Sequence, residues 1–321
     1  MNFDKSTPVA LFIFNRPKLT AQVFERIRAA QPERLLVIAD GPRTARPEEA
    51  ELCGASRDLV SSPDWPCQLL TSFSNENLGC RRRISSGLDW VFQECPEAII
   101  LEDDCLPSAS FFEFCSEMLQ RYRDDARILH VSGDNFQDGV RRGEASYFFS
   151  RYPHTWGWAT WSRAWHGYDV DIPDWPVADR EHWLEFILDN PREVDYWREI
   201  FTRLYQGEID TWDYQWIFTC WRKGGMSVLP NQNLVTNIGV GPDATHLKEG
   251  HSTVGIPAHE LGELTHPTDF VRDEEADRYT FERHILGEPP GASSSFLQRV
   301  RDNLAVRSRM KRLLQRTTGD H

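Results

Sequence analysis

The first part of the chain alternates between short apolar runs and a longer segment with helical periodicity. Residues 8–15 (PVALFIFN) and 33–42 (ERLLVIADGP) are apolar runs of strand length that end in polar or turn residues. Residues 18–30 between them repeat apolar positions at helical spacing. This order predicts a β-α-β unit, which favours parallel strands joined by a right-handed crossover.

The same alternation continues to about residue 135, and residues 147–222 are aromatic and mixed. Trp158, Trp161 and Trp165 follow one another at a spacing that predicts one face of a helix. Further elements are predicted as follows: strands at 67–74, 97–104 and 126–135, helices at 80–95 and 108–125, and a strand with a loop at 226–239.

This pattern predicts an α/β fold with a mixed, mainly parallel sheet flanked by helices. We expect one catalytic domain over 1–286, with a nucleotide-binding half at about 1–135 and an acceptor half at about 136–286. The composition of residues 287–295 (GEPPGASSS) is that of a linker. We therefore assign 287–321 to a linker and a C-terminal tail.

Net charge and cysteine usage narrow the class of protein. The formal net charge of −13 makes a nucleic-acid partner a poor expectation. The seven Cys form no CxxC pair, so we expect reduced thiols in a cytoplasmic protein. We read no signal peptide at the N-terminus, and no apolar stretch approaches the roughly 20 residues of a membrane span.

The C-terminal tail differs in charge from the rest of the chain. Residues 296–316 hold six Arg and one Lys against one Asp. Apolar residues lie roughly along one helical side, which predicts a basic amphipathic helix that contacts an anionic membrane surface. The alternative is a solvated terminal helix or a disordered tail.

Polar residues follow three of the predicted strands. They are Asn15-Arg16, Asp40-Gly41 and the acidic triplet Glu102-Asp103-Asp104. The carboxyl ends of parallel strands share one edge of a sheet, where ligands of α/β proteins bind. Carboxylates beside a helix rich in Arg suit a divalent cation, Mn²⁺ or Mg²⁺, that carries a diphosphate. The alternative for the triplet is a solvated turn at a strand end.

An ordered set of motifs then matches a known family. FIFNRP, IADGP, CRRRISSGLDWVF, EDDCLPSASFFEF, HVSGDN, PHTWGWATWSRAW and WDYQW occur in this order within residues 8–246. The chain resembles the GT-A type nucleotide-sugar glycosyltransferases, most closely the N-acetylglucosaminyltransferase I-like group. The resemblance implies a GT-A, Rossmann-like fold and a metal-binding acidic motif of the DXD type.

The resemblance also implies roles for single residues. Asn15, Arg16, Asp40 and Arg83 would contact the nucleotide end of the donor. Glu102 and Asp103 would touch its base, ribose or sugar, and Asp104 would bind the metal. Many GT-A enzymes place a His late in the chain on the metal, so the resemblance makes His246 a candidate metal ligand; the alternative is a surface His in a loop.

The acceptor side of the site is predicted from two other motifs. Asp213 falls on the position of the catalytic base, with Asp210 as its rival and a helix N-cap as the structural alternative. Trp156 and Trp158, on either side of Gly157, are expected to wall the acceptor cleft.

These observations predict a metal-dependent, inverting glycosyltransferase. It would move a hexosyl or N-acetylhexosaminyl group from a nucleotide donor, with UDP preferred, to a hydroxyl of a glycan or lipid-linked acceptor. The setting would be bacterial-type synthesis of a cell-surface polysaccharide. Two alternatives remain: a sugar nucleotidyltransferase, whose Gly- and Lys-rich loop this chain lacks, and a non-catalytic glycosyltransferase-like scaffold.

Overall fold

The computed structural model describes residues 3–239 and 255–287 of the chain. The chain divides into two compact parts, Met1–Arg278 and Tyr279–His321. His246 and the basic segment 296–316 lie outside the described residues. Within the described ranges, no helix combines the length and the apolar character that crossing a bilayer requires.

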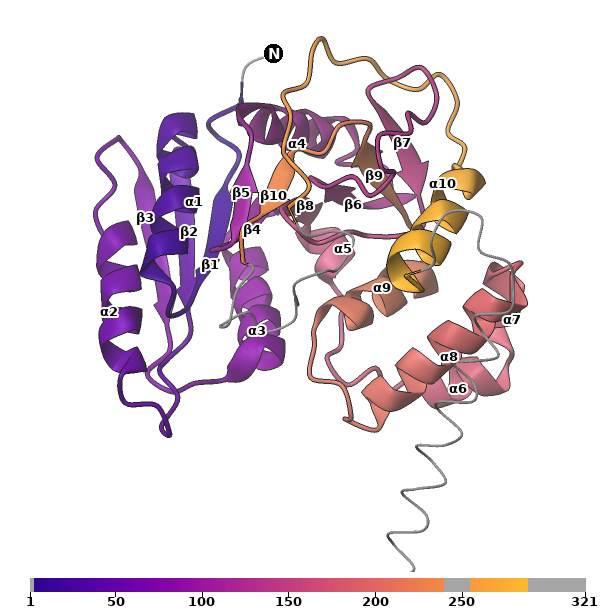
Figure 1. Ribbon diagram of the computed structural model, residues 1–321, viewed down its shortest axis with the longest axis horizontal. Coiled ribbons are helices and arrows are strands. Elements are labelled where there is room, and N and C mark those ends of the chain that lie inside the picture. The colour runs from indigo at the N-terminus through magenta and orange to yellow at the C-terminus, as the bar shows by residue number, and fades with distance from the viewer. Residues whose placement is uncertain (1–2, 240–254, 288–321) are drawn as a thin grey trace, which may run out of the picture. The chain divides into compact units, whose positions relative to one another are not determined.

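A sheet of eight strands forms the centre of the first part (Figure 1), in the order β3-β2-β1-β4-β8-β6-β9-β7. All its strands run in one direction except β7 and β8, which confirms the predicted mixed, mainly parallel sheet flanked by helices. A second, two-stranded sheet pairs β5 with β10. The strands are β1 Val9–Ile13, β2 Arg34–Ala39, β3 Gln68–Phe73, β4 Glu97–Glu102, β5 Cys105–Pro107, β6 Ile128–Ser132, β7 Tyr147–Ser150, β8 Trp158–Trp161, β9 Met226–Pro230 and β10 Val235–Asn237.

Helices cover both faces of the parallel part of this sheet. α1 contacts α2 and α4 on one face, while α3 packs against β2 and β4 and contacts α5. The helices are α1 Pro17–Ala30, α2 Glu49–Val60, α3 Gly79–Glu94, α4 Ala109–Arg121, α5 Ser162–Trp165, α6 Trp175–Arg180, α7 Trp183–Ile187, α8 Pro191–Tyr205, α9 Asp213–Arg222 and α10 Glu274–Tyr279. A π-helix, Thr280–Ile285, follows in the second part of the chain.

The predicted β-α-β unit is present at the start of the chain. Every residue of β1 is buried, and β1 pairs in parallel with both β2 and β4. Pro17 begins α1 directly after Arg16, because its fixed φ suits the first helical position and its missing N–H would be unpaired there. The carboxyl ends of β1, β2 and β4 therefore lie side by side at one edge of the sheet.

The segment around Trp158–Trp161 is a strand, so the predicted helical face of tryptophans is wrong. β8 lies between β4 and β6 and runs antiparallel to both, with Ile100 opposite Trp158. All its side chains are buried. A strand buried on both faces shows no alternation of apolar and polar residues, so the usual sequence signal of a strand is missing here. The spacing of the Trp residues is then the only periodicity to read, and it favours a helix.

Aromatic side chains join the helices α8 and α9. Trp197 on α8 is fully buried and lies against Phe201 and Trp221, with ring centroids 5.4 and 5.1 Å away. Burial of such large side chains is the main favourable term for packing these helices. Most of the tryptophans thus belong to the core.

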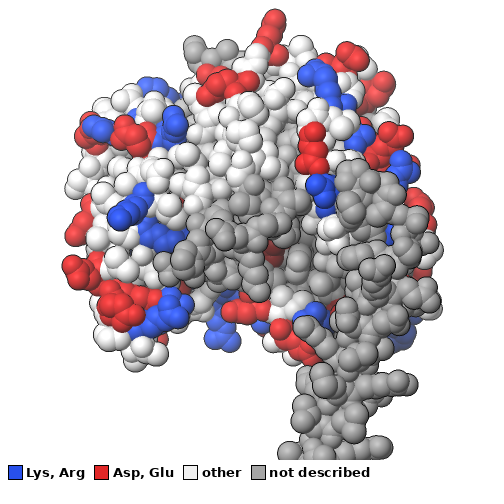
Figure 2. Space-filling model, viewed as in Figure 1, with Lys and Arg blue, Asp and Glu red and all other residues white. Residues whose placement is uncertain are grey.

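Charged side chains lie around the rim of the face shown in Figure 2, with acidic and basic groups interspersed among the described residues. Several such groups form ion pairs, for example Arg198 with Asp179 at 2.9 Å. Exposed pairs of this kind contribute only about 0–1 kcal/mol each. The surface charge therefore contributes little to the stability of the fold.

Candidate active site

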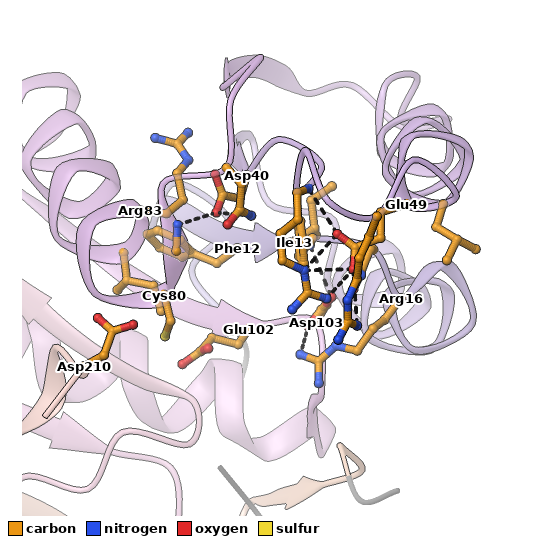
Figure 3. Close-up of a pocket in the computed structure, with 18 of the residues that line it drawn as sticks. Phe12, Ile13, Arg16, Asp40, Glu49, Cys80, Arg83, Glu102, Asp103 and Asp210 are labelled. Carbon is orange, nitrogen blue, oxygen red and sulfur yellow. Dashed lines mark hydrogen bonds and ion pairs between the residues drawn. The ribbon is translucent and has the colours of Figure 1, made fainter. Parts of the chain in front are cut away.

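The three predicted strand ends meet at a cavity of about 820 Å³ (Figure 3). This volume lies within the usual range of small-molecule sites. Its lining includes seven residues predicted for the site: Asn15, Arg16, Asp40, Arg83, Glu102, Asp103 and Asp210. The lining also holds Phe12, Ile13, Phe14, Arg43, Arg46, Glu48, Glu49, Leu52, Asn77, Gly79, Cys80 and Ile84.

The acidic triplet lies at the end of β4, where Arg16 crosses to it from the end of β1. Nη1 of Arg16 donates to Oδ2 of Asp104 at 2.9 Å, and Nη2 pairs with Oδ1 of Asp103. The main-chain amide of Phe14 donates to the other oxygen of Asp103 at 3.3 Å. One guanidinium therefore joins two neighbouring carboxylates.

Negative charge exceeds positive charge at this strand end. Burial, together with the neighbouring charge of Asp104, raises the pKa of Glu102 to about 8 against the lowering effect of Arg16. Burial likewise raises the pKa of Asp103 to about 6, against the lowering effect of Arg16. Carboxylates held this close to one another favour either protonation or a further cation.

Asp40 has a structural role that the sequence did not reveal. Its Oδ1 accepts from the amides of Gly41 and Leu78, both at 2.9 Å, and its Oδ2 accepts from the amide of Gly79 and the side chain of Asn77, both at 3.0 Å. Both carboxylate oxygens are thus engaged at the beginning of α3. Asp40 shapes the cavity wall rather than offering free oxygens to it.

The guanidinium groups that line the cavity already have partners. Arg83 is 8% exposed and donates to the carbonyl of Ala39 at 3.2 Å and to both oxygens of Ser72. Arg43 pairs with Glu49, and Arg46 lies 3.7 Å from the same carboxylate. With Arg16 bound to the triplet, each lining Arg is engaged with a carboxylate or a carbonyl.

Asp210 and Asp213 both lie near Cys80. Burial raises the pKa of the Cys80 thiol, and the carboxylates of Glu102, Asp213 and Asp210 raise it further. Asp210 lines the cavity. Asp213 begins α9, where its Oδ1 accepts from the hydroxyl of Thr211 and from the amide of Tyr214 at 2.9 Å. The predicted base, Asp213, and its rival, Asp210, therefore both lie near the triplet.

Of the two tryptophans expected at the acceptor cleft, Trp158 lies elsewhere. Its side chain is 1% exposed and stacks on His130 and Trp212, with ring centroids 5.0 and 5.6 Å away. A side chain enclosed on both faces offers no surface to an acceptor, so the prediction for Trp158 is corrected to a core position. Trp156 is partly exposed and lies edge-on to Phe136.

A His-Asp pair at the same sheet edge escaped the sequence analysis. Nδ1 of His154 lies 3.1 Å from Oδ1 of Asp134, and both side chains are buried. Oδ2 of Asp134 accepts from the main-chain amide of Trp156 at 3.2 Å. The motifs HVSGDN and PHTWGW contain these residues, but only the fold brings the two motifs together. The pair fixes the position of the Trp156 loop.

Asp104 is the described side chain that best suits a metal ion. It is 15% exposed, and its Oδ1 has only a weak contact, 3.6 Å from Sγ of Cys105. Within the described ranges, no three His, Cys, Asp or Glu side chains gather as a complete metal site. A hard cation that keeps water and phosphate oxygens needs only one or two carboxylates. The excess of carboxylates at the triplet fits such an ion.

The comparisons with known proteins do not assign a family. Neither a protein-family model nor a curated protein sequence matches this chain. The solved structures that resemble part of it include a 4-diphosphocytidyl-2C-methyl-D-erythritol synthase from Anaerococcus prevotii, with 7% identity and a TM-score of 0.36 over 70% of this chain and 89% of that one.

Two further structures show a similar, partial likeness. A cytidylyltransferase from Leptospira borgpetersenii has 13% identity and a TM-score of 0.32 over 58% of this chain and 73% of that one. Mouse xyloside xylosyltransferase 1 has 11% identity and a TM-score of 0.30 over 66% of this chain and 81% of that one. Likeness at this level is too low to assign an activity, so the functional argument rests on the site itself.

Proposed function

We propose that the protein is a metal-dependent, inverting glycosyltransferase that uses a nucleotide-sugar donor, with UDP as the first nucleotide to test. One observation carries this proposal: a cavity of nucleotide size ends at Glu102 and Asp103, which belong to an acidic triplet whose only close cation among the described side chains is Arg16. A diphosphate cannot bind beside Glu102, Asp103 and Asp104 unless a further cation meets it there.

The proposed roles follow from the position of each side chain. The cavity between the ends of β1 and β2 takes the nucleotide, with the wall held by Asp40 and Arg83. Asp104 holds Mn²⁺ or Mg²⁺, and His246 is proposed as its second ligand. The ion, when bound, supplies charge stabilisation for the departing diphosphate.

The acceptor is proposed to enter from the side of α9. Asp213 takes the proton from the acceptor hydroxyl as that oxygen attacks the anomeric carbon opposite the diphosphate, which inverts the configuration. We assign this role to Asp213 because Thr211 orients its carboxylate, and Asp210 serves as the matched rival. Trp156, held by Asp134, offers an aromatic surface to a sugar ring.

The first test is thermal stabilisation by nucleoside diphosphates, with and without Mn²⁺. Ligands that bind the native state raise the unfolding midpoint by mass action. We expect a Mn²⁺-dependent shift with UDP that is lost in Asp104→Asn. Asp124→Asn, which changes an exposed carboxylate after α4, is the control and should keep the shift.

The second step is a search for transfer or slow hydrolysis with a panel of UDP-sugars, followed through the release of UDP. Release of pyrophosphate from a nucleoside triphosphate would instead point to a nucleotidyltransferase. If no nucleotide changes the unfolding midpoint, the transferase proposal is wrong and a scaffold role takes its place.

A further inference from the structure

Arg16 pairs with the carboxylate that would hold the metal ion of the proposed function. Its guanidinium bridges two different carboxylates, Asp103 and Asp104, instead of forming a fork on one of them. Arg16 itself is held at its main chain, where its carbonyl accepts from Thr20 at the start of α1. The backbone is therefore fixed, while the side chain of Arg16 is 23% exposed and lines the cavity.

The two carboxylates that Arg16 bridges, Asp103 and Asp104, differ in how firmly the surrounding protein holds them. The side chain of Asp103 is 3% exposed and also accepts from the amide of Phe14, so its position is fixed by two elements. Asp104 is 15% exposed and offers its Oδ2 to Arg16 alone among the described donors. The Asp104 half of the bridge is therefore the one that opens at the lower cost, because Asp104 is nearer to solvent and has no second described donor on Oδ2.

A hard divalent cation and a guanidinium compete for the same carboxylate. Two positive groups a few ångströms apart repel each other strongly in a partly buried site. The main chain at Gly239 passes close to Asp104, since a Cβ added there would lie 2.2 Å from Oδ2 of Asp104. Asp104 has a short side chain beside this main chain, whereas the long side chain of Arg16 lines the cavity, so Arg16 is the partner that moves.

We propose that Arg16 is a positioning residue that exchanges partners: it holds Asp104 until a divalent cation and a diphosphate bind, and then turns its freed N–H groups to the diphosphate. This inference rests on the proposed function and adds to it that binding of the metal and binding of the nucleotide are coupled through Arg16. The metal alone binds weakly because it must displace Arg16. The metal with the nucleotide binds well, because the phosphate oxygens give Arg16 a new charged partner.

The test measures Mn²⁺ binding directly, through the free-Mn²⁺ signal in electron paramagnetic resonance, with no enzymatic turnover. Without nucleotide, Arg16→Lys should bind Mn²⁺ about tenfold more tightly than the wild type, a factor usual for coupled sites. Lys keeps a positive charge for the buried Asp103 but cannot bridge two carboxylates. Arg16→Gln should show the same direction if it folds.

The same titration in the presence of UDP should show the reverse order, with Arg16→Lys weaker than the wild type. Arg43→Lys is the matched control, because Arg43 also lines the cavity but pairs with Glu49, and it should leave Mn²⁺ binding without nucleotide unchanged.

The outcomes separate this inference from the proposed function. If the wild type binds Mn²⁺ with UDP but Arg16→Lys binds Mn²⁺ alone no more tightly, the exchange is wrong and the metal site stands. If Arg43→Lys tightens Mn²⁺ binding as much as Arg16→Lys, the effect is not specific to the bridge and the exchange is also wrong. If no variant binds Mn²⁺ with or without UDP, both proposals fall.

Discussion

Asp40 at the end of β2 binds the amide of Gly79, at 3.0 Å, and thereby fixes the first residue of α3. This contact joins a strand end to the helix that forms the opposite wall of the cavity. Gly41 completes the junction, because a Cβ there would lie 2.6 Å from the main chain of Glu76. The cavity wall therefore depends on a buried carboxylate and on a close approach between two main chains.

Replacing Asp40 by Ala should lower both stability and nucleotide binding. The change leaves the amides of Leu78 and Gly79 without their acceptor, which should cost about 1–3 kcal/mol in the free energy of unfolding. Chemical denaturation measures this loss. Asp58→Ala, on the exposed side of α2, is the control and should change stability little. An unchanged free energy of unfolding in Asp40→Ala would contradict the capping role.

Gly239→Ala tests the position of Asp104. The added Cβ would lie 2.2 Å from Oδ2 and 2.9 Å from Cβ of Asp104, so the carboxylate has to shift. We expect a clear loss of the Mn²⁺-dependent thermal shift with UDP. Gly262→Ala is the matched control, since a Cβ there meets nothing within 4 Å. Equal thermal shifts in the two variants would show that binding of Mn²⁺ and UDP does not depend on the observed position of the Asp104 carboxylate.

Asp213→Asn should reduce transfer and leave donor binding intact. Loss of a general base usually costs about 10²–10⁴-fold in rate. Asp210 lies three residues before Asp213 in the chain and is also close to Cys80; Asp210→Asn should keep most of the activity. UDP release with acceptor present measures the rate, and the thermal shift with UDP and Mn²⁺ measures donor binding. A larger loss in Asp210→Asn would move the base to that residue.

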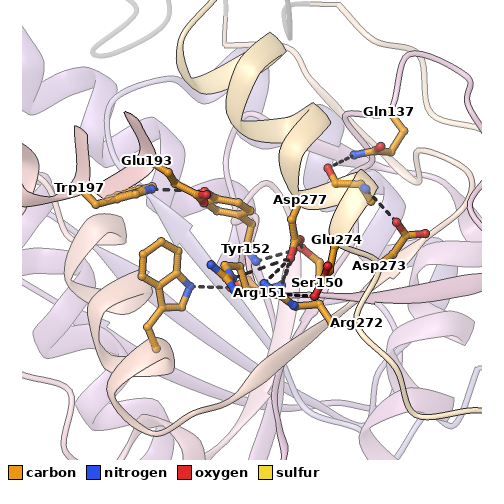
Figure 4. A network of polar contacts seen from close by, with 12 residues as sticks. Gln137, Ser150, Arg151, Tyr152, Glu193, Trp197, Arg272, Asp273, Glu274 and Asp277 are labelled. Carbon is orange, nitrogen blue, oxygen red and sulfur yellow. Dashed lines mark hydrogen bonds and ion pairs between the residues drawn. The ribbon is translucent and has the colours of Figure 1, made fainter. Parts of the chain in front are cut away.

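The buried carboxylate of Glu193 should make stability depend on pH (Figure 4). Burial raises its pKa to about 7, although the hydroxyl of Tyr152 donates to it and lowers the pKa. In the unfolded chain the pKa of this group is near its ordinary value of 4.5. The stability contributed by the protonated form is therefore present below pH 4.5 and is lost as the pH rises through 7.

Denaturant titrations between pH 4.5 and 8 should thus show stability falling with pH, by up to about 3 kcal/mol from this group. Glu193→Gln should flatten the slope in this range. Asp277, whose pKa burial also raises to about 7, should contribute a second, similar slope. A Glu193→Gln profile that is parallel to the wild type would contradict a buried, protonated carboxyl group.

The sequence alone determined the parallel part of the sheet and the place of the acidic triplet. The apolar run 98–101 is long enough for a strand and ends at the charged triplet, so both the strand and the polar residues that follow it can be seen in the local sequence. The alternation with helical segments then fixes the handedness of the crossovers. On this basis the sequence predicts that Arg16 lies near Glu102 and Asp103, because the carboxyl ends of parallel strands lie at the same edge of a sheet.

Only the tertiary structure decided what each polar side chain does there. Asp40 follows a strand, as ligand-binding residues often do, but main-chain amides more than 30 positions away donate hydrogen bonds to its carboxylate oxygens. Trp158 has helical spacing to Trp161, yet it lies in a strand between β4 and β6 and is closed off on both faces. In both cases the partners are distant in sequence, and burial depends on all neighbours at once, which no local pattern records.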